Sequence, residues 1–73
     1  MNKPKIGVLG LGHLGKIHLK LLLEQPHAIC SGVYDTNKSR CEAMQERYDV
    51  HVFPNEEELI KASDAVILVT PTP

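Results

Sequence analysis

Residues 6–15 read IGVLGLGHLG, and this stretch decides the fold. The apolar run at residues 5–9 does not alternate between polar and apolar side chains, which is typical of a parallel strand buried on both faces. Three glycines follow it in the spacing G-x-G-x-x-G, and apolar side chains then recur at helical spacing over residues 13–24. The stretch therefore predicts a buried strand, a sharp turn and a helix.

Each glycine of the turn has its own expected purpose. Gly10 allows the sharp turn from strand to helix, Gly12 lets a pyrophosphate approach the backbone, and Gly15 lets the helix pack close to the strand. The free N–H groups of His13, Leu14 and Gly15 then point at the phosphates, aided by the helix dipole. The alternative is a plain strand–turn–helix in which glycine serves packing alone. The preceding strand, the following helix and a downstream acid favour binding of a dinucleotide cofactor.

Apolar residues of the first helix suggest which of its faces is buried. Ile17, Leu21 and the neighbourhood of Leu14 and Leu22 recur at helical spacing, so we expect this face to meet the sheet. We expect His18 to be a partly buried packing residue rather than a catalytic one.

The rest of the chain continues the alternation of strands and helices. Strands are expected at residues 28–34, 50–53 and 65–69, with helices from Thr36 or Asn37 to about Tyr48 and from Asn55 through Ala62. Alternating strands and helices imply a parallel sheet with right-handed crossovers. We therefore predict an α/β fold, a partial doubly wound (Rossmann) sheet of strand order 3-2-1-4 with helices on both faces.

Asp35 ends the second expected strand, 20 residues after Gly15. A carboxylate there accepts hydrogen bonds from both adenosine ribose hydroxyls, whereas a 2′-phosphate meets a like charge. This favours NAD over NADP, although Lys38 and Arg40 stand close behind and soften the discrimination. Capping of the following helix is an alternative role for Asp35 that is compatible with binding.

The sequence VTPTP follows the last expected strand at the carboxyl end of the sheet. Hydroxyl and carbonyl groups of Thr70 and Thr72 are candidates for contact with a ribose or nicotinamide, and Pro71 stiffens the loop. A simple strand terminator is an equally good interpretation.

Composition excludes several other functions. The chain has 73 residues, is 42% hydrophobic and 23% charged, and carries a net charge of −1, so no basic surface for nucleic acid or membrane is expected. Cys30 and Cys41 form no C-x-x-C pair, which indicates reduced thiols and a cytoplasmic location. His27 and His51 have no metal-ligand spacing, so no metal is expected.

These residues together resemble a known family. The stretch GLGHLGKIHL with its pair His18-Leu19, the residues VYD at 33–35 and the ending ELIKASDAVILVTPTP are similar to the amino-terminal Rossmann domain of the glucose–fructose oxidoreductase, inositol dehydrogenase and rhizopine catabolism (Gfo/Idh/MocA) family. The resemblance implies an NAD(P)-dependent oxidoreductase acting on sugars, cyclitols or related hydroxylated small molecules. It implies cofactor contacts from Gly10, Gly12, Gly15, Asp35 and the loop Thr70-Pro71-Thr72.

The resemblance also implies that residues 1–73 are a truncated N-terminal part of the dinucleotide-binding domain. The family's substrate domain, its catalytic lysine in a Glu-Lys-Pro motif and its catalytic histidine are then expected outside this chain, which holds no catalytic residue. The apolar strand at residues 65–69 is expected to be central in the sheet, or else to form an exposed edge open to homo-oligomer formation. The alternatives are a non-catalytic NAD-sensing regulatory module and a Rossmann enzyme that uses a flavin or S-adenosylmethionine.

Overall fold

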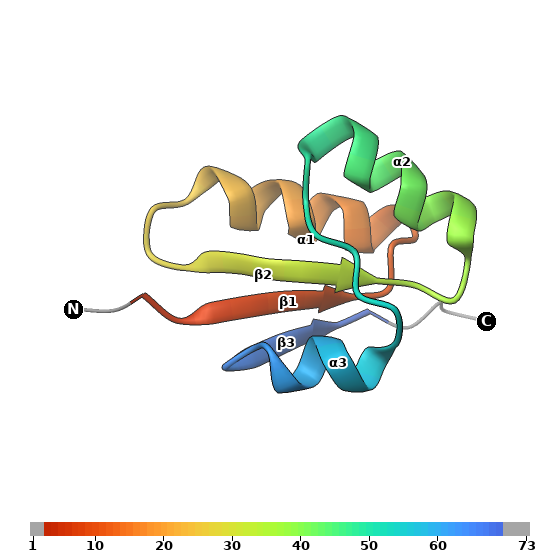
Figure 1. Cartoon of the computed structure of the whole chain (residues 1–73). Helices are drawn as coiled ribbons and strands as arrows, with labels where there is room; N and C mark the ends of the chain where they lie inside the picture. Colours follow the sequence, from red (N-terminus) through yellow and green to blue (C-terminus); the bar gives the residue numbers. More distant parts are fainter. Residues whose placement is uncertain (1–2, 70–73) are drawn as a thin grey trace.

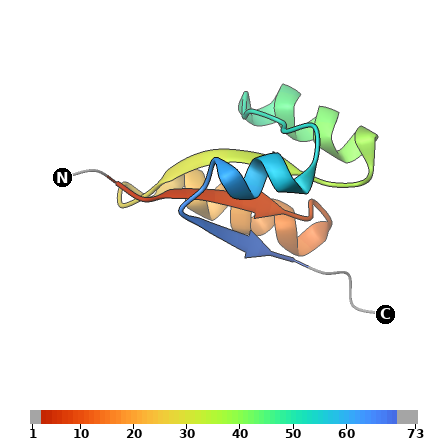
Figure 2. The ribbon, with the colours of Figure 1, turned by 60° about the horizontal axis from the view of Figure 1, so that its bottom comes forward.

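A computed structural model of the chain describes residues 3–69. The elements in this range are β1 (Lys5–Leu9), α1 (His13–Glu24), β2 (Ile29–Tyr34), α2 (Lys38–Tyr48), α3 (Glu56–Lys61) and β3 (Ala65–Leu68). The three strands are parallel and lie in the order β2-β1-β3 (Figure 1). In Figure 2, α3 lies in front of the sheet and α1 behind it, so helices cover both faces. The predicted α/β class with a parallel Rossmann-like sheet is confirmed.

The four-stranded order 3-2-1-4 is not confirmed, because residues 50–53 form no strand of the sheet. This segment makes a single isolated parallel bridge, between Val52 and Val33 of β2. Asp49 ends α2 in the left-handed conformation, with φ 54°, and Pro54 has no N–H to continue a ladder. The backbone of the segment meets β2 through two hydrogen bonds, from the Val33 N–H to the His51 carbonyl at 2.8 Å and from the Phe53 N–H to the Val33 carbonyl at 3.0 Å. The segment therefore lies beside β2 without forming a strand of the sheet.

The strand β3 occupies an edge of the described sheet rather than the expected central position. It pairs with β1 and with no other strand within residues 3–69. Its last residue Leu68 is 65% exposed. Self-association through this edge stays a prediction.

One hydrophobic core lies between the sheet and the pair α1 and α2. Val8 and Val33 are fully buried on this sheet face. Helix α1 contributes Leu19 and Leu22, and α2 contributes Cys41 and Met44. On the other face, α3 packs so close to the sheet that a Cβ added to Gly7 would lie 2.5 Å from Cδ1 of Leu59.

The buried face of α1 differs from the one expected from the sequence. Leu22 is buried as predicted, but Ile17 is 42% exposed and Leu21 is 57% exposed. The residues of α1 that face the core are Gly15, Leu19 and Leu22. The leucines of α1 lie on several sides of the helix, so the spacing of its apolar residues is compatible with more than one buried face. The close approach permitted by Gly15 selects one of them.

The orientation of α1, which buries Leu22 and exposes Leu21, predicts different effects on stability when each of these leucines is replaced. Leu22→Ala is expected to lower the free energy of unfolding by about 2–4 kcal/mol, because it leaves a cavity in the core. Leu21→Ala is expected to change it by no more than about 0.5 kcal/mol, because that side chain is mostly in solvent. Urea unfolding followed by circular dichroism measures both values. A larger loss for Leu21→Ala would contradict the observed packing.

Candidate functional site

The start of α1 differs from the starts of the other two helices. The side chain of Asn37 caps α2 by accepting two backbone N–H groups of the first turn, and that of Asn55 caps α3 by accepting the N–H of Glu58. These two caps agree with the sequence-based expectation. Helix α1 has Gly12 at its N-cap, with no side-chain hydrogen bond and no acidic residue in its first turn. Its first N–H groups thus lack a side-chain partner among residues 3–69, which suits an external anion.

The three glycines of the turn meet different surroundings. Gly10 has φ 105°, and a Cβ there would overlap the carbonyl oxygen of Val69. A Cβ on Gly15 would overlap the carbonyl oxygen of Gly10. A Cβ on Gly12, by contrast, would find its nearest neighbour 3.7 Å away, at Nη1 of Arg40. The fold itself therefore requires glycine at positions 10 and 15, whereas position 12 faces open space.

The carboxylate of Asp35 ties the end of β2 to the glycine turn. Its Oδ2 accepts the backbone N–H of Leu11 at 2.6 Å, and its Oδ1 accepts that of Asn37 at 2.7 Å. The side chain is 9% exposed. A carboxylate offers about four lone-pair sites, so two remain for ligand hydroxyls. The alternative role as helix cap is wrong, because Asn37 is the N-cap of α2.

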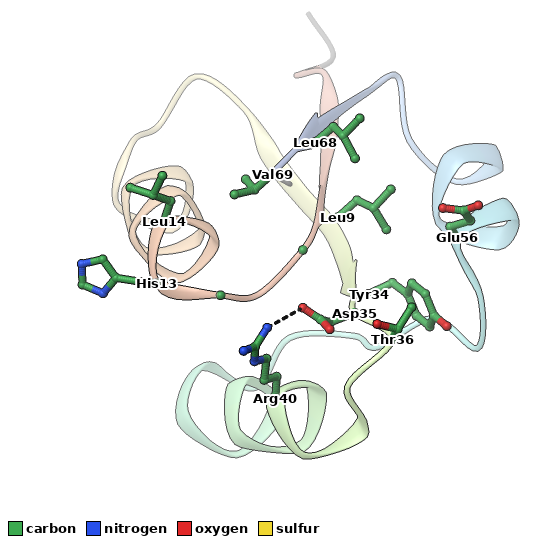
Figure 3. Close-up of a pocket in the computed structure, with 12 residues that line it drawn as sticks. Leu9, His13, Leu14, Tyr34, Asp35, Thr36, Arg40, Glu56, Leu68 and Val69 are labelled. Atoms are coloured by element: carbon green, nitrogen blue, oxygen red, sulfur yellow. Dashed lines mark ion pairs between the residues drawn. The ribbon is translucent and has the colours of Figure 1, made fainter. Parts of the chain in front are cut away.

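A cavity of about 530 Å³ opens where the carboxyl ends of the strands meet the glycine turn. Figure 3 shows Asp35 and Arg40 next to each other as an ion pair in the wall of the cavity, while the imidazole of His13 points away. The residues that line the cavity are Leu9, Gly10, Gly12, His13, Leu14, Tyr34, Asp35, Thr36, Arg40, Glu56, Leu68 and Val69. Its size and its largely apolar wall with a few polar groups suit a small organic ligand.

Most of the residues singled out from the sequence meet at this cavity. Gly10, Gly12, His13, Leu14 and Asp35 line it, and Gly15 is buried beneath the turn. The remaining candidates, Thr70, Pro71 and Thr72, lie outside the described residues.

Arg40, which sequence reasoning placed close behind Asp35, also lines the cavity, whereas Lys38 does not. Several other residues of the wall were missed. Tyr34 and Leu9 are the last residues of their strands, so the rule that ligands bind at strand ends provides a signal for them. Glu56 comes from α3 on the opposite face of the sheet, and no local pattern marks it.

Other polar candidates lie away from the cavity. His18 is exposed, so its expected packing role is wrong. Cys30 and Cys41 are free thiols, and burial raises the pKa of each, which disfavours the reactive thiolate. No helix among residues 3–69 is long and apolar enough to span a membrane.

Comparisons with known proteins agree with this geometry. Residues 4–73 match a family model described as an oxidoreductase family with an NAD-binding Rossmann fold. The chain is 34% identical over 67 residues to glucose-6-phosphate 3-dehydrogenase of Bacillus subtilis. This match covers 92% of this chain and 19% of that protein. It is 37% identical over 71 residues to UDP-N-acetylglucosamine 3-dehydrogenase of Acidithiobacillus ferrooxidans, covering 93% of this chain and 21% of that protein.

A solved structure shows the same arrangement. The UDP-N-acetylglucosamine 3-dehydrogenase structure from Acidithiobacillus ferrooxidans superposes with a TM-score of 0.82 at 34% identity, over 99% of this chain and 23% of that one. The chain thus spans about a fifth of the length of the curated relatives it matches.

Proposed function

This chain belongs to the Gfo/Idh/MocA oxidoreductase family with its NAD-binding Rossmann fold, and from that premise we propose that the cavity beside the glycine turn holds NAD for hydride exchange with a sugar, a cyclitol or a related hydroxylated small molecule. One observation carries the assignment. The open space above Gly12 and the carboxylate of Asp35 belong to the same cavity. A pyrophosphate needs the first feature, and an adenosine ribose needs the second.

Backbone groups of the turn bind the pyrophosphate in this proposal. The N–H groups of His13, Leu14 and Gly15 begin α1, where the helix dipole favours negative charge. The absence of a Cβ at Gly12 lets the phosphate oxygens reach them.

Asp35 binds the adenosine ribose through the two lone-pair sites that its backbone bonds leave free. NAD is preferred over NADP, because a 2′-phosphate removes one hydroxyl donor and brings a like charge to the carboxylate. Thr70, Pro71 and Thr72 directly follow Val69, which lines the cavity. This position in the sequence supports a contact of these residues with the ribose or nicotinamide.

The proposed substrate class rests on the relatives. Their names are those of 3-dehydrogenases of glucose 6-phosphate and of UDP-N-acetylglucosamine, both of which are hydroxylated sugars. NAD supplies the hydride acceptor at its nicotinamide ring. The described residues of this chain bind and orient the cofactor, and we assign no catalytic residue to them.

Replacing Asp35 tests this function. Asp35→Asn is expected to raise the Kd for NAD about tenfold, because the amide is uncharged and keeps one acceptor oxygen, which leaves fewer lone pairs for the ribose hydroxyls beside the backbone bonds. A titration of the ¹⁵N-labelled chain with NAD, followed by amide chemical shifts, gives the Kd. The same spectra report whether the variant is folded. In the unsubstituted chain the shifts are expected at Asp35 and at the amides of residues 13–15, which bind the pyrophosphate in this proposal.

A matched control is Asp64→Asn. Asp64 also accepts a backbone N–H, that of Lys5 at 2.7 Å, but it does not line the cavity. This control is expected to bind NAD as the unsubstituted chain does. Equal Kd values for Asp35→Asn and the unsubstituted chain, or shifts centred on Lys5 and Asp64, would overturn the proposed site.

A further inference from the structure

A second cavity lies at the end of the sheet opposite to the glycine turn. Its volume is about 1210 Å³, and it opens where β1 and β2 begin and where the chain passes from α3 to β3. In Figure 1 all three strand arrows start at this end and point toward the other one. The wall combines three lysines and one acid with apolar residues, among them Lys3, Lys5, Lys61, Asp64, Pro4 and Ile29. None of these residues lines the cavity proposed for NAD, so the two sites are separate.

The second cavity gathers positive charge in a chain whose net charge is −1. Three ammonium groups border it, against the single carboxylate of Asp64. That carboxylate is engaged with the backbone, because its Oδ2 accepts the N–H of Lys5 at 2.7 Å. Within residues 3–69, neither Lys3 nor Lys5 forms an ion pair, and Lys61 has an exposed pair with Glu57 at 3.8 Å. Such exposed pairs are weak, so the three ammonium groups are available to an external anion.

An apolar surface adjoins these ammonium groups. Ile29 is the first residue of β2 and is 48% exposed. Its N–H donates to the carbonyl of Pro4 at 2.9 Å, which holds the two residues side by side at the start of the sheet. Ligand sites commonly join an apolar wall with a few polar groups that fix orientation. This wall therefore suits a ligand that has an anionic end and an apolar body.

We propose that the second cavity binds a small organic phosphate monoester. The phosphate lies among the ammonium groups of Lys3, Lys5 and Lys61, and the organic part lies against Ile29 and Pro4. A phosphate monoester carries nearly two negative charges at neutral pH, and lysine binds phosphate as a point charge. The diester phosphates of NAD carry one charge each, so NAD is the weaker ligand here. This second site does not depend on the proposed NAD site.

The first test uses phenyl phosphate as the probe. It is added to the ¹⁵N-labelled chain at low ionic strength, where the attraction between exposed charges is least screened. Saturable amide shifts are expected at Lys5, Ile29 and residues 61–64. The amides of residues 13–15 report any binding at the glycine turn separately.

Two lysine variants separate a built site from general attraction by charge. Lys61 and Lys20 are both exposed helical lysines with a glutamate four residues away, Lys61 with Glu57 at 3.8 Å and Lys20 with Glu24 at 4.0 Å. Lys20 lines neither cavity. Lys61→Gln is expected to raise the Kd for phenyl phosphate at least about fivefold, and Lys20→Gln by less than about twofold.

A comparison with inorganic phosphate tests the apolar wall. Inorganic phosphate has a similar charge but no organic part, so its Kd is expected to be at least about fivefold higher than that of phenyl phosphate. Ile29→Thr keeps a β-branched side chain on the strand but removes apolar surface. It is expected to reduce this difference and to leave the Kd for inorganic phosphate within about twofold.

Equal effects of Lys61→Gln and Lys20→Gln would reduce the binding to general charge attraction and overturn this inference. So would the absence of shifts at residues 61–64, or equal Kd values for phenyl phosphate and inorganic phosphate. A chain that binds phenyl phosphate as expected but does not bind NAD keeps this inference and loses the proposed function. A chain that binds NAD and leaves residues 61–64 unshifted by phenyl phosphate keeps the function and loses the inference.

Discussion

Gly15→Ala is expected to destabilise the folded chain by about 2–3 kcal/mol and to lower its Tm by about 10–20 °C. Helix propensity alone predicts the opposite sign, because alanine is favoured over glycine by about 1 kcal/mol inside a helix. Here the added Cβ would overlap the carbonyl oxygen of Gly10 and lie 2.8 Å from its carbonyl carbon. Both are backbone atoms of a tight turn, so no side-chain rotation relieves the contact, and the steric cost exceeds the propensity gain. Thermal unfolding followed by circular dichroism measures the difference.

Gly12→Ala is the matched control for this stability measurement. It adds the same methyl group three residues earlier, where the nearest atom is 3.7 Å away. Its Tm is expected within a few degrees of that of the unsubstituted chain. A Gly15→Ala chain that melts at or above the unsubstituted chain would contradict the close packing of α1 against the turn.

Local signals in the sequence are sufficient to predict most of the fold. The glycine turn sets the end of β1 and the start of α1, and Asn37 and Asn55 cap the next two helices as their side chains suggest. These features depend on residues within a few positions of one another. For this reason the helices begin where the sequence places them.

Features that depend on tertiary contacts are less accessible from the sequence. The four residues at 50–53 have a strand-like composition, but between Asp49, which ends α2, and Pro54 they make a single bridge to β2. The rotation of α1 is likewise set by the contact of Gly15 with Gly10. Hydrophobic periodicity does not fix the buried face of α1, because its leucines occur on several sides of the helix.

The candidate site, like the fold, is predictable from the sequence in part. The G-x-G-x-x-G spacing and Asp35 mark its polar part, because each has a chemical purpose at a fixed distance in sequence. The hydrogen bond from Leu11 to Asp35 adds a second purpose, since this carboxylate also holds the turn in place. Arg40, which the sequence also places near Asp35, lines the cavity as well. Glu56 enters it through the packing of α3, which only the folded chain reveals.

The central claim is that the open space above Gly12 receives the pyrophosphate of NAD. Gly12 has φ −70° and ψ −166°, which alanine adopts without strain, so Gly12→Ala leaves the free chain folded. The added methyl group then occupies the space that the phosphate needs. The most direct test is a titration of ¹⁵N-labelled Gly12→Ala and unsubstituted chains with NAD. We expect equally dispersed amide spectra and a Kd at least about tenfold higher in the variant, a loss of ~1.4 kcal/mol or more. Equal Kd values with the same pattern of shifted amides would contradict the account.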